Sequence, residues 1–124
     1  MKRNIKKKIV ALILAIVILA AMPLMTVSAA WRATWTNSSF SASGSLERPD
    51  NAIFVAVAAT RASGYYCYAE VYAEFTSGPP QQNPANGANS ATANIANSNS
   101  YSVTSAASRH IVGSVIDQYL YIPN

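Results

Sequence analysis

Residues 65 to 75, Tyr-Tyr-Cys-Tyr-Ala-Glu-Val-Tyr-Ala-Glu-Phe, decide the fold class of this 124-residue chain. The small or apolar phase of this stretch is Cys67, Ala69, Val71, Ala73 and Phe75, and the polar phase is Tyr66, Tyr68, Glu70, Tyr72 and Glu74. Successive side chains alternate between the two faces of a strand, whereas a helix repeats every 3.6 residues. The pattern therefore predicts a half-buried β-strand and excludes a helix.

The stretch just before it, residues 52 to 60, is short, almost wholly apolar and partly β-branched. Such a run is typical of a strand that is covered on both faces. Residues 61 to 64, Arg-Ala-Ser-Gly, separate the two strands. We therefore predict a hairpin of residues 52 to 60 with residues 65 to 75.

Further upstream, a second alternation begins at Trp31, Ala33 and Trp35 and resumes one step out of phase at Phe40. A bulge or tight turn at residues 37 to 39 would absorb the slip. The two tryptophans are predicted as core anchors of a first strand. Residues 47 to 51, Glu-Arg-Pro-Asp-Asn, are typical of a turn.

The downstream half is less regular. Residues 76 to 89 lack a large apolar side chain, so we expect a flexible loop there. A second, weaker hairpin is predicted around a turn at residues 97 to 100. Residues 105 to 122 fit either a helix or a strand, and we favour a strand because the sheet needs a partner for its last edge.

The N-terminal 30 residues have the pattern of a secretory signal peptide. Five cations in residues 1 to 8 precede the apolar run Ile9 to Ala21, and Val27-Ser28-Ala29 is a small-x-small cleavage pattern. Cleavage is expected after Ala29 or Ala30, which leaves residues 31 to 124 as one secreted domain. The long cationic start resembles the signal peptides of Gram-positive bacteria. Contact with a membrane is expected only through this leader before cleavage.

Charge and composition exclude several classes of function. The chain has nine Lys and Arg against five Asp and Glu, but five of the cations lie in the leader, so residues 31 to 124 carry a net charge of −1. A nucleic-acid partner is not expected, because it requires a cationic face. With only Cys67 and His110 as soft ligands, neither a metal site nor a cofactor is expected.

No catalytic residues are predicted, and the protein is not expected to be an enzyme. Glu70 and Glu74 would stand about 13 Å apart on a strand, beyond the roughly 5 to 9.5 Å of glycosidase carboxylate pairs. His110 and Asp117 have no nucleophile motif around them. Cys67 belongs to the predicted inner face, and whether it pairs between chains stays open.

The polar phase of residues 66 to 74 is the predicted ligand-binding site. Tyr66 and Tyr68 would lie about 6.6 Å apart on one face, and carboxylates would flank this aromatic platform. Such a surface suits stacking on the sugar rings of cell-wall or host glycans. The alternative is that the tyrosines only make cross-strand pairs on a half-solvated sheet.

The predicted fold is all-β, a small antiparallel β-sandwich of about six strands, and its exposed edges would also allow oligomers. The cationic leader, cysteine-poor short domain, aromatic start at Trp31 and Ser/Ala/Asn-rich strands resemble the small secreted β-sheet bacteriocins of the lactococcin type. This resemblance implies, as an alternative function, an antibacterial protein that acts on a surface target of neighbouring bacteria. It covers the plan of the chain and no motif, so it assigns no residue.

Overall fold

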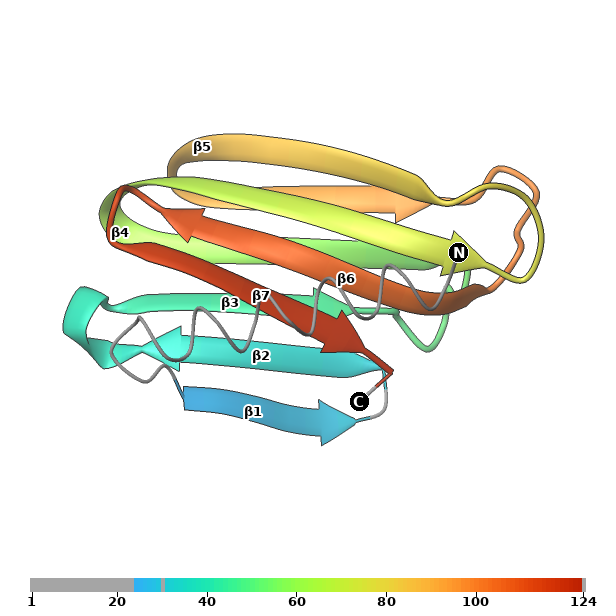
Figure 1. The fold of residues 1–124 in the computed structure, drawn as a ribbon, viewed down its shortest axis with the longest axis horizontal. Coiled ribbons are helices and arrows are strands. Elements are labelled where there is room, and N and C mark those ends of the chain that lie inside the picture. The colour runs from blue at the N-terminus through green and yellow to red at the C-terminus, as the bar shows by residue number, and fades with distance from the viewer. Residues whose placement is uncertain (1–23, 30, 124) are drawn as a thin grey trace.

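The computed structural model describes residues 24–29 and 31–123, and nearly all of this part is antiparallel β-structure (Figure 1). Its strands are β1 (Leu24–Ala29), β2 (Arg32–Asn37), β3 (Ala42–Glu47), β4 (Val55–Phe75), β5 (Gln81–Ala96), β6 (Val103–Val112) and β7 (Ile116–Ile122). They form one sheet in the order β1-β2-β3-β4-β6-β7, and β5 also pairs with β4. The predicted all-β, antiparallel fold class is confirmed, but the strands form one seven-stranded sheet where a sandwich of about six strands was predicted.

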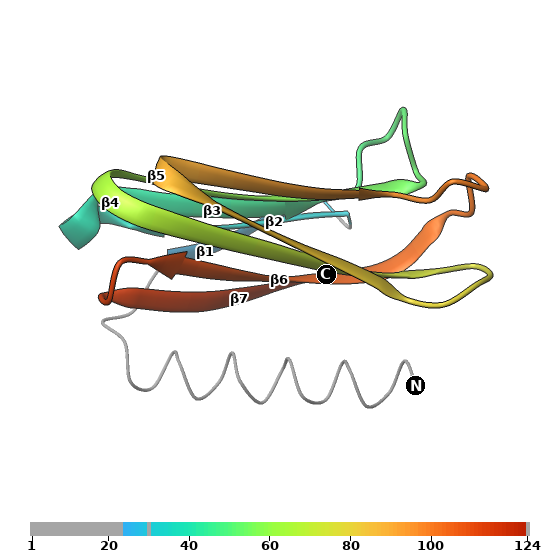
Figure 2. The same cartoon turned by 90° about the horizontal axis from the view of Figure 1, so that it is seen from above.

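The sheet curls over because its two longest strands bend at the same place. The first half of β4 pairs with β3 and the second half with β6, while β5 follows β4 on both sides of the bend. At the bend, Gly64 (φ +82°) and Asn89 (φ +68°) have left-handed backbone, and the Gly64 N–H donates to Asn89 Oδ1 at 2.8 Å. Glycine and asparagine tolerate this conformation best. Figure 2 shows the result, in which β6 and β7 form a layer against β2 and β3.

The predicted hairpin of residues 52 to 60 with 65 to 75 is wrong. Both segments belong to the single bent strand β4, and both pair with β5 instead of with each other. They face one another across the core, where the Thr60 hydroxyl donates to the Tyr68 carbonyl at 2.8 Å. Residues 61 to 64 do change the direction of the chain, but they bend one strand and do not separate two. Both halves of this strand pair with β5 along the same edge.

The predicted flexible loop over residues 76 to 89 is also wrong for most of its length. Only residues 76 to 80 form a turn, and Gln81 to Asn89 are the first half of β5. These side chains are mostly exposed, so backbone pairing with β4, and not burial, orders them. Pro84 is tolerated because, within the part of the chain that the structure describes, this half of β5 pairs with β4 along one edge and has no partner strand along the other.

Of three further local predictions, the tight turn near residues 37 to 39 and the strand in residues 105 to 122 are confirmed, and the second hairpin is wrong. A single-turn 3-10 helix, Ser38–Phe40, makes the tight turn between β2 and β3. The ambiguous stretch 105 to 122 is strand, in β6 and β7. The second hairpin is wrong, since β5 and β6 both pair with β4 and not with each other, although the chain does turn at residues 97 to 100.

The predicted leader lies largely outside the described residues. The expected signal helix falls in residues 1–23, and Leu24–Ala29, its predicted C-terminal end, forms β1 against β2. Within the described ranges there is no helix long and apolar enough to cross a membrane.

The core consists mostly of small side chains around a few large ones. Trp35, Leu46 and Leu120 are fully buried among many alanines, which confirms Trp35 as a core anchor. Trp35 fits because Gly44 on the neighbouring strand has no side chain, and a Cβ there would stand 2.1 Å from Trp35 Nε1. The same Cβ would stand 2.9 Å from His110 Nδ1 on β6, so the two layers pack closely at this point.

A polar group lies in the centre of this core. His110 is 0% exposed, with Nδ1 2.8 Å from Thr60 Oγ1 and Nε2 2.7 Å from Ser108 Oγ. The Thr60 hydroxyl proton is directed to the Tyr68 carbonyl, so Nδ1 is the donor and Nε2 accepts from Ser108. Burial lowers the pKa of His110 to about 3, and the ring is neutral at physiological pH.

Candidate functional site

The tyrosine-bearing face of β4 lies on the outside of the β4–β6–β7 layer. In register with it, β6 presents Arg109 beside Glu70, and β7 presents Tyr119 beside Arg109. We call this surface the aromatic face; it comprises Tyr66, Tyr68, Glu70, Tyr72, Arg109, Asp117 and Tyr119. All seven project from paired strands, so the sheet fixes their spacing.

An ion pair holds the middle of the aromatic face. Arg109 donates two hydrogen bonds to Asp117 from one edge of its guanidinium, with Nε–Oδ1 and Nη2–Oδ2 distances of 3.0 and 2.7 Å. The guanidinium carbon lies 5.6 Å from the centre of the Tyr119 ring. Hydrogen bonding to Asp117 raises the pKa of Arg109 above its ordinary value. This bidentate arrangement orients the guanidinium against the aromatic ring.

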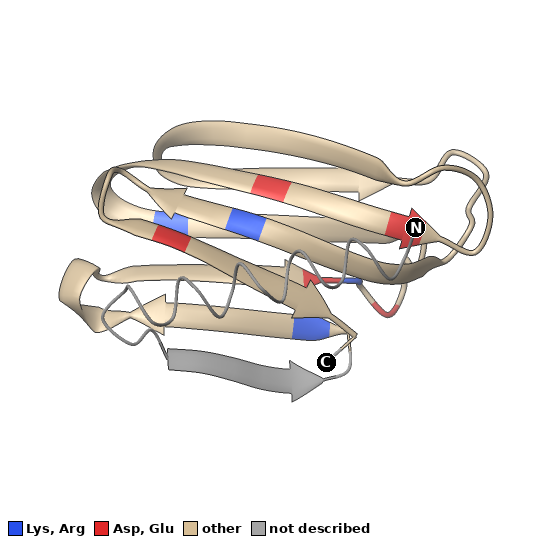
Figure 3. Ribbon diagram, viewed as in Figure 1, with Lys and Arg blue, Asp and Glu red and all other residues tan. Residues whose placement is uncertain are grey.

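The aromatic face contains a shallow depression of about 150 Å³. Its lining residues are Glu70, Tyr72, Ala107, Ser108, Arg109 and Tyr119. Glu70 is held in place by Gln82, whose Nε2 donates to Glu70 Oε2 at 3.0 Å. The depression thus combines tyrosine rings, a carboxylate and a guanidinium around a small apolar base, and the nearby charges of opposite sign are interspersed (Figure 3).

The tyrosines of the aromatic face are neutral hydrogen-bonding groups. Burial raises the pKa of Tyr68, and the carboxylate of Glu70 adds to the effect. Burial likewise raises the pKa values of Tyr72 and Tyr119. Because all three phenols stay protonated well above neutral pH, the face offers hydroxyl donors and ring surfaces and no phenolate nucleophile.

The structure brings together four of the five predicted site residues. Tyr66 is 61% exposed and donates to Asn86 Oδ1 at 2.8 Å, while Tyr68, Glu70 and Tyr72 are half-buried beside it. Glu74 departs from the prediction. It is only 5% exposed at the end of β4 and accepts a hydrogen bond from Ser105 Oγ at 2.8 Å, so it takes no part in the surface.

Sequence reasoning missed Arg109, Asp117 and Tyr119. One signal was present, because residues 118 to 122 alternate and the opposite phase contains Tyr119 and Tyr121. What the sequence did not reveal is that β6 would lie between β4 and β7 and so place Arg109 between the two sets of tyrosines.

The other reactive side chains do not form a second centre. His110 points into the core, whereas Asp117 pairs with Arg109 on the outer face, so the two do not meet as a catalytic pair. Cys67 is free and 0% exposed, and burial raises the pKa of its thiol, so its predicted inner-face position is confirmed. Within the described ranges, no three His, Cys, Asp or Glu residues gather as metal ligands.

Compared with models of protein families, with curated proteins and with solved structures, the chain matches none of them.

Proposed function

We propose that this protein is a small secreted, non-enzymatic β-sandwich that binds cell-wall or host glycans through the aromatic face. The observation that carries the proposal is the depression in which Tyr72 and Tyr119 adjoin Glu70 and Arg109. A pyranose ring has an apolar face of C–H groups and a rim of hydroxyls. The tyrosine rings suit stacking on the apolar face. Glu70, as an acceptor, and Arg109, as a donor, suit hydrogen bonds to the hydroxyls of the rim.

The rigidity of the face supports this assignment. Its side chains stand on three adjacent paired strands, and Glu70 and Arg109 are each held by a neighbour. Side chains that are already fixed lose little conformational freedom on binding, so weak individual contacts add up more effectively. The depression has room for about one sugar unit, and the exposed ring of Tyr66 extends the surface along β4.

The charge of the face also fits a neutral ligand. Arg109 is paired with Asp117, and Glu70 lies beside Arg109 in the register, so one positive group stands against two negative groups and the face disfavours acidic sugars. We therefore expect binding of neutral sugars that changes little with salt, because the contacts are stacking and short-range hydrogen bonds.

The test is retention on insoluble peptidoglycan and on chitin. The full sequence is expressed, and the protein is purified in the form that the expressing cells produce. Tyr119→Ala removes a ring from the depression and should lower the affinity about tenfold. Tyr101→Ala is the matched control, since Tyr101 is an exposed tyrosine outside the aromatic face and its loss should leave retention unchanged. Equal retention of both variants, or no retention of the unsubstituted protein, would contradict the proposal.

The antibacterial function remains a separate prediction. It expects that the purified protein inhibits the growth of bacteria related to its source, and inactivity against a broad panel would count against it. Glycan binding is preferred because the aromatic face provides a specific surface for it.

A further inference from the structure

A second concave surface lies on the opposite side of the molecule, on the outside of the layer made by β2, β3 and the first half of β4. Its side chains form cross-strand rows: Thr36 pairs with Ser43 and Ser43 with Arg61, and Thr34 pairs with Ser45. We call this surface the hydroxyl face; it comprises Arg32, Thr34, Thr36, Ser43, Ser45 and Arg61.

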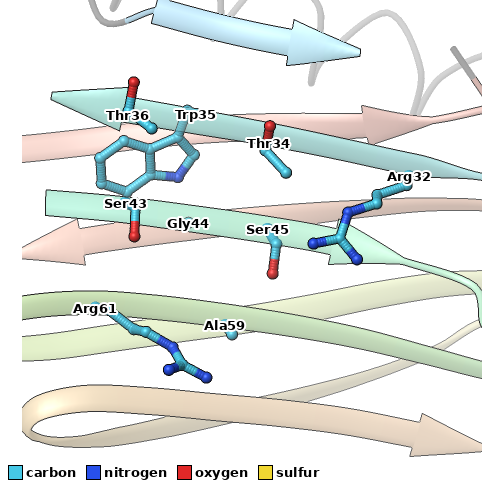
Figure 4. A pocket seen from close by; sticks show the side chains of 9 residues that line it. All are labelled: Arg32, Thr34, Trp35, Thr36, Ser43, Gly44, Ser45, Ala59 and Arg61. Atoms are coloured by element: carbon cyan, nitrogen blue, oxygen red, sulfur yellow. The ribbon is translucent and has the colours of Figure 1, made fainter. Parts of the chain in front are cut away.

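The hydroxyl face contains a depression of about 380 Å³, larger than that of the aromatic face (Figure 4). The small side chain of Ala59 leaves space in its middle, and the hydroxyls of β2 and β3 line it. In Figure 4 the guanidinium groups of Arg32 and Arg61 extend from its two ends toward this middle. The depression is therefore a cationic hollow lined with hydroxyls.

The charge of this hollow differs from that of the aromatic face. Arg61 is exposed and has no ion-pair partner among the described residues. Arg32 pairs with Glu47 through Nη1 and Oε2 at 3.0 Å, but Glu47 does not line the depression. Two guanidinium groups thus border the hollow and no carboxylate of the described residues lines it, so it attracts an anionic ligand.

The spacing indicates an extended ligand and not a single small anion. Arg32 and Arg61 lie in cross-strand rows that are four residues apart, which is about 13 Å along the strand direction. Across the strands, β2 and β4 are separated by two strand spacings, or about 10 Å. A chain of sugars could span this distance. Its hydroxyls would bond to the serines and threonines, and its acidic groups would reach the arginines at either end.

We propose that the hydroxyl face is a second binding site that takes an acidic polysaccharide, with Arg61 and Arg32 pairing with its carboxylate or sulfate groups. The near-neutral charge of residues 31 to 124 argues against a nucleic acid, which needs a broad cationic surface. This site is independent of the aromatic face, and together the two sites make the protein a bridge between neutral and acidic glycans.

The experiment measures the affinity for polygalacturonate and for dextran sulfate at low salt, with neutral dextran as the reference polymer. Arg61→Gln should weaken binding of the acidic polymers about tenfold, because a charge-assisted hydrogen bond is lost. Arg61→Lys keeps the charge but not the planar fork, so it should restore part of the affinity. Binding of one polymer only would support the site and identify its acidic group.

Two matched variants separate this proposal from the first. Arg109→Gln changes the net charge equally but lies on the aromatic face, so acidic-polymer binding should persist while retention on chitin falls. Thr92 lies in the same cross-strand row as Ser45 and Ala59 but does not line the depression. Thr92→Ala should therefore leave the binding of the acidic polymers unchanged. An Arg61→Gln variant that binds like the unsubstituted protein, or an equal loss in Arg109→Gln, would overturn the proposal.

Discussion

The aromatic face and the hydroxyl face are built on the same strand, yet they differ in almost every surface property. β4 supplies Tyr68, Glu70 and Tyr72 to one and Arg61 to the other, because its two halves lie in opposite layers after the bend at Gly64. The aromatic face has large rings and a paired guanidinium. The hydroxyl face has short alcohols and an arginine without an ion-pair partner in the described chain.

The inner sides of the two layers are much more alike. Both are dominated by alanine with a few larger residues, and they meet around His110, Thr60 and Trp35. The difference between the faces therefore arises only from the outward phase of each strand. A fold of this kind can change one face without changing the other, provided that the common core is kept. Core substitutions should affect both faces together, and outward substitutions only one.

Gly44→Ala should have the largest effect on both faces. The new Cβ would stand 2.1 Å from Trp35 Nε1 and 2.9 Å from His110 Nδ1, and both rings are fully buried. We expect a loss of about 3 kcal/mol or more in the free energy of unfolding, because the layers must separate to make room. Chemical denaturation followed by tryptophan fluorescence measures it, with Ser45→Ala, on the outward side of the same strand, as the control. Equal stability of Gly44→Ala and the unsubstituted protein would mean that the layers do not meet there.

Acid should weaken both faces together through His110. Its pKa is lowered from 6.5 to about 3 in the folded protein, so between these values the unfolded chain binds a proton that the folded chain does not. Stability should therefore fall as the pH falls through this window, by up to about 1.4 kcal/mol per pH unit from this group. The measurement is the unfolding free energy from pH 7 to pH 4, compared with His110→Gln. A variant with the same pH slope as the unsubstituted protein would contradict the assignment.

Asp117→Asn should have a small effect on stability and act on one face only. The Arg109–Asp117 pair is about 40% exposed, so its loss should cost less than about 1 kcal/mol of folding free energy. Chitin binding should fall a few-fold because Arg109 loses its orientation, and acidic-polymer binding should not change.

Glu47→Gln removes the carboxylate that pairs with Arg32 on the hydroxyl face. It should strengthen binding of the acidic polymers and leave chitin binding unchanged. Both variants are measured by retention on chitin and by affinity for the acidic polymers, and parallel effects on both ligands would contradict the distinction between the faces.

The sequence was most informative where side-chain alternation and burial agree. The inward phase from Cys67 to Phe75 was predicted correctly because one strand pattern suffices to identify it. The strand from Gln81 to Asn89 was missed because its order comes from backbone pairing with β4, which leaves little trace in side-chain hydrophobicity. The same limit explains the wrong hairpin, since the glycine at position 64 signals a reversal but not which strand will lie beside it.

The candidate site could be predicted in part for the same reason. Tyr66, Tyr68, Glu70 and Tyr72 lie on one strand, so their common face follows from a period of two. Arg109 and Tyr119 come from strands whose neighbours depend on the topology of the whole sheet. Glu74 was misplaced because its burial reflects the end of β4 closing against β6, where Ser105 lies opposite it.

The most direct test of the central claim is a titration of the isotope-labelled protein with the neutral oligosaccharide chitohexaose, followed by amide chemical shifts. We predict that the shifts concentrate on the second half of β4, on β6 and on β7, around Tyr72, Arg109 and Tyr119, while β2 and β3 remain unchanged. Shifts centred on β2 and β3, or no saturable shifts at all, would contradict the assignment of the aromatic face as the glycan-binding site.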